Sequence, residues 1–246
     1  MNILRNLVLI IPVLFIISCN SNSKKPLIAK VDIVFQEDSL KFTESQKDFI
    51  REVISNSEEE VRDLLPNLPD SIKVSVEAVD WDLDIVSGVT GRTETNSPPL
   101  VLVQISHNYK GGVIDSVYQG IKSTIFHEFH HLSRGWAIQD NKFSYGIPNA
   151  MVNEGLAVAF TEIYTGNINE VNAYTDEAGN WVREILALPL DADYAQWVMG
   201  EHPDGRTYIG YRTGNFLARQ AMKKSGKSIL ELSNLMPNEI IKLAGY

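Results

Sequence analysis

The sequence predicts an α+β fold in which a small mixed α/β half precedes a helical half. Two features of the hydrophobic pattern indicate this. Alternating apolar and polar residues, typical of strands, occur almost entirely before residue 113. Apolar residues spaced three and four apart, typical of helices, dominate from about residue 115 to the end. We therefore expect one domain over residues 27–246, with an α/β half at 27–112 and a helical half at 113–246.

The start of the chain resembles a bacterial export signal, so we do not expect it to be part of the fold. Arg5 is followed by an apolar run from Leu7 to Ile17, which is short for a spanning helix of about 20 residues. The run ends next to Cys19 in a sequence that resembles a lipobox, in which the cysteine is lipidated. We expect a signal peptide at 1–18, lipidation of Cys19 and a polar tether at 19–26. The simpler alternative is a membrane-anchored tail with an incidental cysteine.

Composition and charge restrict the partners of the protein. Cys19 is the only cysteine, so no disulfide can form within the chain, and a core of this length does not need one. The formal net charge of −9 offers no basic surface, which excludes a nucleic-acid-binding role. We expect a monomer in the bacterial cell envelope, held at the membrane by its N-terminal lipid and facing the periplasm or the exterior.

The elements of the α/β half follow from alternation and from one capping pattern. Thr43 and Gln46 have the spacing of a capping box, which predicts a helix that starts there and ends before Pro66. Residues 95–99 form a cluster that interrupts regular structure. Strands are expected where β-rich runs occur, at 27–35, 73–79, 84–93 and 100–106.

The helical half contains five segments with helical spacing: 116–134, 148–165, 176–187, 205–224 and 227–243. The first of them has clear end signals. Asp115 is a candidate N-cap, and Gly135 is a candidate for the left-handed residue that ends the helix. Its apolar residues form one stripe: Ile121, Ile125, Phe129 and Leu132.

A pair of histidines on this helix predicts a metal site. His127 and His131 are four residues apart, so both imidazoles lie on one face and can bind one ion, with Glu128 between them. His130 points away from the pair, which makes it the less favoured partner of His127. The alternative without a metal is that these histidines belong to the surface or to the core.

A catalytic zinc ion has three protein ligands and one open position, so a third ligand is needed. Glu154 is the favoured candidate, 23 residues after His131 in the segment 148–165. Asp140 and Glu162 are the competing carboxylates. Three small residues follow Glu154 and would let its helix approach the histidine helix closely: Gly155, Ala157 and Ala159.

These residues together resemble a known pattern. His127 to His131 with Asn153 to Ala157 resembles the HExxH pattern of gluzincin metallopeptidases, the thermolysin type. With Arg134 and with Tyr208 to Tyr211, the string is similar to a narrower bacterial family of predicted zinc-dependent proteases, domain-of-unknown-function family 2268. The similarity covers roughly residues 100–220. One departure is Val158, where thermolysin has an aspartate that supports a histidine ligand.

The resemblance implies a zincin-like fold with Zn²⁺ bound by His127, His131 and Glu154. Glu128 would then be the general base for an attacking water. A Tyr or His between residues 201 and 212 would donate to the negative charge of the transition state. Tyr208 is favoured there over Tyr211 and His202, although both tyrosines would also suit simple helix packing.

The resemblance also implies that an edge strand binds the substrate backbone, and residues 100–106 are the candidate. The alternative is an internal strand without a ligand. The resulting expectation is a zinc metallopeptidase that cleaves a peptide or protein substrate outside the cytoplasm. Two other readings stay open: a metal-binding envelope lipoprotein without catalysis, and a zinc hydrolase of a non-peptide amide.

Overall fold

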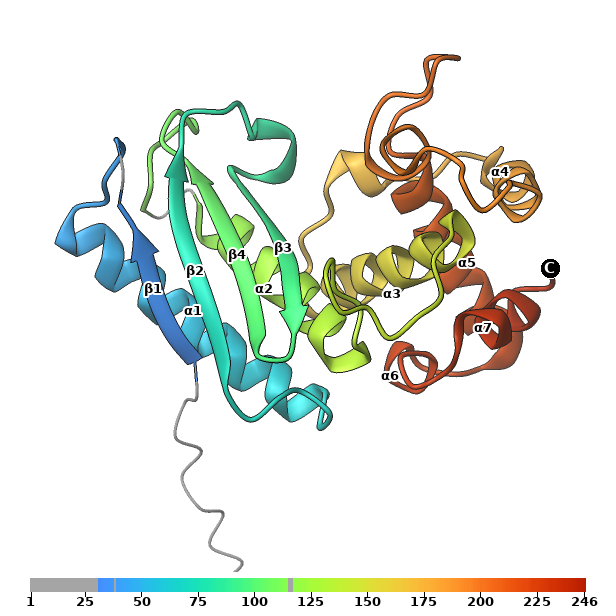
Figure 1. The fold of residues 1–246 in the computed structure, drawn as a ribbon, viewed down its shortest axis with the longest axis horizontal. Helices are drawn as coiled ribbons and strands as arrows, with labels where there is room; N and C mark the ends of the chain where they lie inside the picture. The colour runs from blue at the N-terminus through green and yellow to red at the C-terminus, as the bar shows by residue number, and fades with distance from the viewer. Residues whose placement is uncertain (1–30, 38, 115–116) are drawn as a thin grey trace, which may run out of the picture.

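The computed structural model describes residues 31–37, 39–114 and 117–246. These residues confirm the α+β class, with a four-stranded sheet in the first half and a helical second half (Figure 1). The signal peptide, the lipidation of Cys19 and the tether are predictions that lie outside the described residues, as does Asp115 as an N-cap. In the described part, α2 (Tyr118–Arg134) begins after Val117, which makes no side-chain cap.

The sheet has the strand order β1-β2-β4-β3. β1 (Val31–Gln36), β2 (Ile72–Val79) and β4 (Pro99–Ser106) are parallel neighbours, and β3 (Val89–Asn96) runs antiparallel to β4. The segment predicted as a strand at 84–93 starts instead with the short helix η1 (Asp84–Val86).

The prediction that residues 100–106 form an edge strand is wrong. This segment is β4, which pairs with β2 on one side and with β3 on the other, so it has no free edge. The edge strands are β1 on one side and β3 on the other, because a tight hairpin at residues 97–98 places β3 along the outer side of β4. The cluster at 95–99, which is predicted to interrupt regular structure, is this hairpin together with the strand ends on either side.

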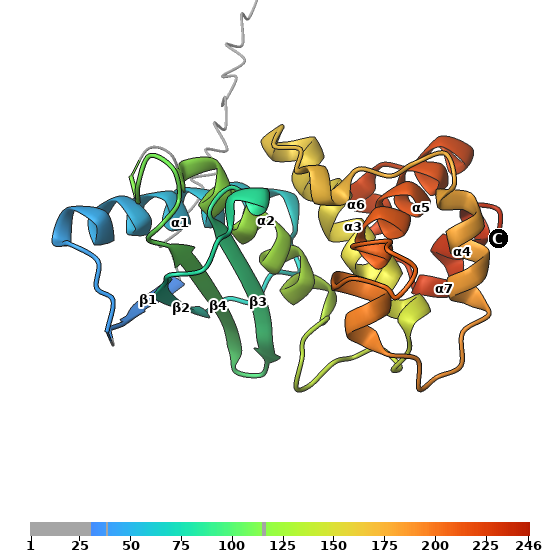
Figure 2. The same ribbon diagram turned by 90° about the horizontal axis from the view of Figure 1, so that it is seen from above.

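Two helices cover one face of the sheet (Figure 2). α1 (Glu44–Leu64) starts at the capping box of Thr43 and Gln46, as predicted: the Gln46 backbone N–H donates to Thr43 Oγ1, and the Thr43 N–H donates to Gln46 Oε1 at 2.8 Å. α2 lies beside it and places its predicted apolar stripe in the core between the sheet and α3. Gly135 ends α2 in the left-handed region, as expected, with φ of 82°.

The helical half packs around α3 and α5. Its members are α3 (Ile147–Thr165), η3 (Glu170–Asn172), α4 (Ala178–Leu186), η4 (Ala195–Met199), α5 (Ile209–Ser225), α6 (Ile229–Leu232) and α7 (Pro237–Leu243). Two predicted helices differ from these. The helix predicted at 205–224 starts later, because Tyr208 adopts a left-handed conformation with φ of 52°. The helix predicted at 227–243 is interrupted, since Pro237 starts a new helix and cannot continue the previous one.

The closest helix approach in this half is between α3 and α5. A Cβ atom on Gly155 would lie 2.0 Å from the carbonyl carbon of Gly214, and one on Gly214 would lie 2.1 Å from the Met151 oxygen. The two backbones therefore touch where the helices cross. We expect from the sequence that the small Gly155 lets α3 approach α2, the helix that carries the histidines. This expectation is wrong, because Gly155 faces α5 on another side of α3.

No helix among residues 31–37, 39–114 and 117–246 combines the length and the apolar character needed to span a bilayer.

Candidate metal centre

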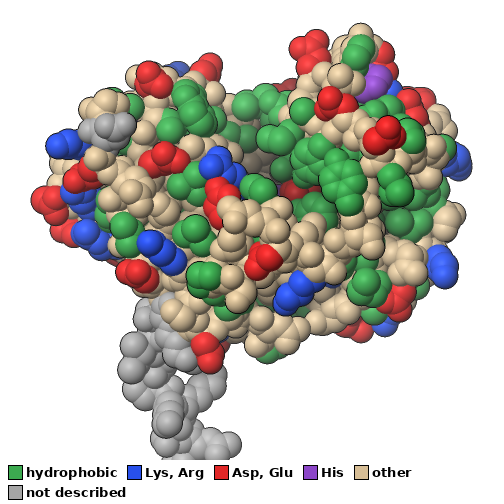
Figure 3. Space-filling view, viewed as in Figure 1, with side chains coloured by type: hydrophobic (Ala, Val, Ile, Leu, Met, Phe, Trp, Pro, Cys, Tyr) green, Lys and Arg blue, Asp and Glu red, His purple; other side chains and the backbone are tan. Residues whose placement is uncertain are grey.

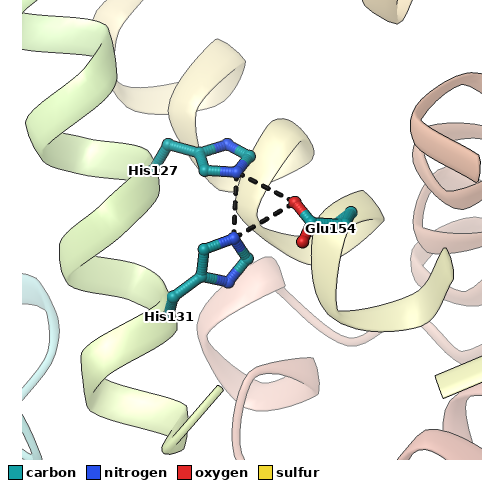
Figure 4. A group of neighbouring side chains, drawn as sticks. All are labelled: His127, His131 and Glu154. Atoms are coloured by element: carbon teal, nitrogen blue, oxygen red, sulfur yellow. Dashed lines mark hydrogen bonds and ion pairs between the residues drawn. The ribbon is translucent and has the colours of Figure 1, made fainter. Parts of the chain in front are cut away.

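The core packing of α2 sets the direction of its histidines. Ile121, Ile125 and Phe129 have no exposed surface, which fixes the rotation of the helix about its axis. His127 and His131, four residues apart, then share the face of α2 that is turned towards α3. Glu154 comes from α3 and points back at this pair (Figure 4).

The three side chains converge on one point. His127 Nε2 and His131 Nε2 are 3.0 Å apart, and each lies 3.2 Å from Glu154 Oε2. Nitrogen and oxygen ligands at about 2.0–2.1 Å from a tetrahedral zinc ion lie about 3.3 Å apart, close to the observed triangle. The donor set of two imidazoles and one carboxylate is also one that catalytic zinc uses. His127, His131 and Glu154 can therefore hold a metal ion.

The charges in the cluster favour a bound cation. Burial alone would raise the pKa of Glu154, but His131 and His127 outweigh it and lower this pKa well below its ordinary value. The Glu154 carboxyl group is therefore an anion. Burial lowers the pKa of His127, but Glu154 and Glu128 outweigh it and raise this pKa. The cluster thus contains buried negative charge that a divalent cation would compensate.

Two residues that the sequence did not identify hold the carboxylates in place. The indole Nε1 of Trp136 donates a hydrogen bond of 2.9 Å to Glu154 Oε1, the oxygen that does not face the histidines. Thr93, on the edge strand β3, lies with its hydroxyl 3.0 Å from both Glu128 Oε2 and the Glu128 backbone oxygen. Trp136 lies two residues after the end of α2, which is its only signal in the sequence. Thr93 has no such signal.

His130 lies outside this cluster. Its Nε2 is 2.8 Å from Ser233 Oγ, and that hydroxyl donates to the Ile229 oxygen, so Nε2 of His130 must carry the donated proton. Burial, and then Arg134, lower the pKa of His130 well below its ordinary value, which keeps the ring neutral. His130 is thus a core histidine held by a hydrogen bond to the C-terminal helices.

The competing ligand candidates have other partners. Asp140 accepts backbone hydrogen bonds from Asn96 and Ser97, so it closes the β3–β4 hairpin. Glu162 forms an ion pair of 2.7 Å with Arg219. His202, which was a candidate donor to the transition state and not a candidate ligand, forms a contact of 2.9 Å with Asp204.

Three tyrosines lie near the cluster. The ring of Tyr211 stacks against His127 with a centroid distance of 6.2 Å, and Tyr208 lines the adjacent cleft. Burial, followed by the charge of Glu154, raises the pKa of Tyr211 well above its ordinary value, so its hydroxyl stays protonated. Tyr194 was not identified from the sequence. Burial, and then the charges of Glu154 and Glu128, also raise its pKa.

A cleft of about 180 Å³ opens beside the cluster, between the sheet half and the helical half. His127 and Glu128 line it together with Gly91 of the edge strand. Figure 3 shows a hollow between the two halves, with hydrophobic side chains on its walls. A Cβ atom on Gly91 would lie 2.6 Å from Thr124 and 3.1 Å from Glu128, so glycine lets β3 lie close to the metal helix.

Comparison with known proteins gives one match. No curated protein and no solved structure matches the chain. Residues 101–242, more than half of the sequence, match a family described as predicted Zn-dependent protease. The matched region contains α2, α3 and α5, and therefore all three residues of the metal cluster. The chain thus belongs to DUF2268, the predicted zinc-dependent protease family that the sequence pattern resembles.

Proposed function

We propose that this protein is a zinc-dependent metallopeptidase that cleaves peptide bonds of a peptide or protein substrate outside the cytoplasm. The observation that carries the proposal is the triangle of His127, His131 and Glu154 at the wall of a cleft that Glu128 also lines. A zinc ion held by these ligands would act as a Lewis acid and lower the pKa of a water molecule to about 7.

Glu128 is the proposed general base. Its side chain is 5% exposed, and Thr93 occupies Oε2, which leaves Oε1 to accept a proton. In the proposed reaction Glu128 takes the proton of the attacking water as its oxygen bonds to the carbonyl carbon. Glu128 then gives this proton to the amine nitrogen as the C–N bond breaks, so that it returns to its starting form.

Tyr211 is the proposed donor to the carbonyl oxygen, on which negative charge develops. Its ring is beside His127 and its raised pKa keeps the O–H available as a donor. Tyr208 was favoured from the sequence and stays an alternative, because it also lines the cleft. Its left-handed backbone is of a kind that proteins retain mainly at functional sites.

The edge strand supports a peptide substrate over a non-peptide amide. The Thr93 oxygen faces away from β4 and accepts a hydrogen bond of 3.1 Å from the Ile138 N–H. Because peptide groups alternate along a strand, those of Val89 and Gly91 point the same way, into the cleft that both residues line. An extended substrate can pair with this edge as an added strand.

The proposed location outside the cytoplasm rests on the sequence alone. The signal peptide at 1–18 and the lipidated Cys19 would anchor the protein to the bacterial envelope. A Cys19→Ser variant is expected to leave the membrane fraction. If this variant stays membrane-bound to the same extent as the wild type, the lipid anchor is excluded.

The variant Glu128→Gln tests the function. It keeps the size of the side chain but removes the base, so it is expected to retain zinc and to lose peptide hydrolysis. Metal analysis and cleavage of a mixed peptide library measure the two properties. Full activity in Glu128→Gln would exclude Glu128 as the base. A wild-type protein that binds zinc but cleaves no peptide would favour the non-catalytic lipoprotein, or, if it hydrolyses other amides, the amide hydrolase.

A further inference from the structure

The outer edge of β3 is free over only part of its length. The Ser106 N–H donates to the Gly88 oxygen at 2.9 Å, so every second residue counted from Gly88 turns its peptide groups towards β4. The peptide groups of Val89, Gly91 and Thr93 therefore face outward. The register between β3 and β4 is unbroken up to Thr93, so this alternation holds for all three residues.

The α2–α3 loop, residues 135–146, occupies the edge from Thr93 onward. The Ile138 N–H donates to the Thr93 oxygen at 3.1 Å, and the Gln139 N–H donates to the Glu94 oxygen at 3.0 Å. The Glu94 oxygen also faces outward, because a bulge shifts the register between residues 93 and 95. The loop therefore lies where an added strand would lie, and Figure 1 shows it beside the carboxyl end of β3.

Side chains fasten this loop to the sheet. The Asp140 carboxylate accepts hydrogen bonds from the backbone N–H groups of Asn96 at 2.6 Å and Ser97 at 2.9 Å. In return, Asn96 Nδ2 donates to the backbone oxygens of Gly135 at 3.1 Å and Asp140 at 3.0 Å. Trp136, near the start of the loop, donates to a metal ligand. The loop is thus fixed both to the strand and to the metal site.

Before Thr93, the accessible residue of the edge is Gly91. It is half-buried and lines the cleft, and none of the described residues is hydrogen-bonded to its outward peptide groups. Val89 is only 2% exposed, and a hydrogen bond of 3.2 Å between Ser87 and Asn169 joins the helical half to the chain just before it. A substrate backbone can therefore pair fully with Gly91, while the outward positions on either side of it are covered.

The packing of α2 on β3 locates the metal site along this edge. Neighbours on the two elements advance together, four residues on the helix for two on the strand: Gly120 lies beside Val89, Thr124 beside Gly91, and Glu128 beside Thr93. Four helical residues rise about 6 Å and two strand residues about 6.6 Å, so α2 and β3 stay in step. The histidine pair, at residues 127 and 131, is centred one residue beyond Glu128 and is therefore level with Thr93. The free part of the edge lies on one side of the metal site, and the closed part begins at it.

We propose that the edge strand holds the substrate backbone on one side of the cleaved bond only, through Gly91, and that the α2–α3 loop ends this pairing at the metal site. The substrate must present an N–H and a C=O to Gly91 on the paired side. On the other side β3 offers no main-chain partner, so residues without an N–H, such as proline, are accepted there. The inference rests on the proposed peptidase function and extends it to the class of peptides that are cleaved.

A scan of N-methylated peptides tests the one-sided pairing. Each backbone N–H of a cleaved peptide, except that of the cleaved bond, is replaced in turn by N–CH₃, and kcat/KM is measured with the zinc-loaded protein. We expect a loss of about five- to tenfold at one position on one side, which corresponds to one hydrogen bond, and less than about twofold on the other side. Equal losses on the two sides would overturn the proposal.

Hydrogen exchange separates this inference from a failure of catalysis. In zinc-loaded Glu128→Gln, a peptide selected for binding from the mixed library should slow the exchange of the Gly91 N–H by about tenfold or more. The N–H groups of Ile138 and Gln139 already donate to β3, so their exchange should be slow both before and after binding. If the wild type cleaves no peptide, the proposed function fails, and this measurement still decides the inference. An unprotected Gly91 N–H, or an Ile138 N–H that is released on binding, would overturn it.

The variant Asp140→Ala tests the role of the loop. It removes the acceptor that fastens the loop to the hairpin, so exchange of the Ile138 N–H should become faster and the Thr93 oxygen should become available to the substrate. N-methylation on the previously tolerant side should then lower kcat/KM by about threefold or more.

Asp82→Ala is the matched control, because Asp82 also accepts a backbone N–H, at 3.0 Å from Asp84, but lies outside the α2–α3 loop. This control should keep the one-sided pattern of the wild type. If the tolerant side stays tolerant in Asp140→Ala although the Ile138 N–H exchanges freely, the loop is not what ends the pairing and the proposal is overturned.

Discussion

Two buried polar clusters lie on different sides of α2, and they differ in what completes them. His131 belongs to the first, with His127 and Glu154, where three potential metal ligands face one another. His130 belongs to the second, where Ser233 accepts from its ring. Both histidines are almost fully buried, so burial alone does not distinguish a ligand from a core residue. The hydrogen-bonding partners of each ring distinguish the ligand from the core residue.

The second cluster also explains how the C-terminal helices are attached. The guanidinium group of Arg134 donates to Asn153 at 2.9 Å, to the Leu235 oxygen at 3.1 Å, and to the Ser233 oxygen. Burial lowers the pKa of Arg134 to about 10, a value at which the group is still charged at neutral pH. One cluster is therefore built for a ligand, and the other connects α2 to α3 and to the segment between α6 and α7.

The largest expected difference between the clusters is in metal binding. His131→Ala removes one of the three donors and should lower the zinc content from about one ion per chain to almost none, with loss of hydrolysis. His130→Ala should keep about one zinc ion per chain, because its ring faces Ser233. Metal analysis of both purified variants measures this. Zinc retained in His131→Ala and lost in His130→Ala would reverse the comparison.

Arg134→Met should lower the stability of the protein and leave its zinc content unchanged, the opposite of what is expected for His131→Ala. It leaves the Ser233 and Leu235 oxygens without their donor, and we expect the free energy of unfolding to fall by about 2–4 kcal/mol. The zinc content should stay close to that of the wild type, since no ligand is touched. Urea unfolding of the zinc-loaded protein, together with metal analysis, measures both properties. A loss of zinc without a loss of stability would show that the two clusters are not separate.

Trp136→Phe tests whether the indole hydrogen bond supports the ligand Glu154, because phenylalanine keeps an aromatic ring but has no N–H. Loss of the indole hydrogen bond frees Glu154 Oε1, and such supporting contacts change metal affinity by about 10–100-fold. Competition with a coloured chelator measures the zinc affinity. Trp181→Phe is the control, since Trp181 packs against Arg206 in another part of the helical half. Equal zinc affinities in the two variants would remove Trp136 from the site.

Ser233→Ala should have the smallest effect. It leaves the Nε2–H of His130 without an acceptor and should lower the free energy of unfolding by about 1–2 kcal/mol. Ser225→Ala is the comparison variant, because the Ser225 hydroxyl also donates to a helix carbonyl but has no histidine partner. Thermal unfolding of the two variants should place Ser233→Ala lower. The same midpoint in both would mean that the His130 hydrogen bond contributes little.

The sequence predicted most of the fold and the members of the metal cluster, because both depend on local spacing. The i, i+4 relation of His127 and His131 follows from helix geometry, and the apolar stripe of α2 gives their direction. The edge strand was not predicted correctly. Whether β3 or β4 lies at the edge depends on how a hairpin folds back, and this is decided by pairing between segments far apart in the sequence.

The supporting residues were missed for a related reason. Thr93 and Glu128 are 35 residues apart and meet only because β3 packs on α2. The small size of Gly155 was recognised, but its direction was not, because a glycine shows that something approaches closely and not which element does.

The backbone contact between Gly155 and Gly214 holds α3 and α5 together, and with them two residues of the site, Glu154 and Tyr211. Glu154 precedes Gly155, and Tyr211 lies three residues before Gly214, so the backbone contact fixes the ligand and the tyrosine relative to each other. The two histidines stand on α2, outside this pair of helices. A relative motion of α2 and α3 would therefore separate histidines from carboxylate and leave Glu154 and Tyr211 together. Assembly of the metal site thus depends on the packing of α2 against α3.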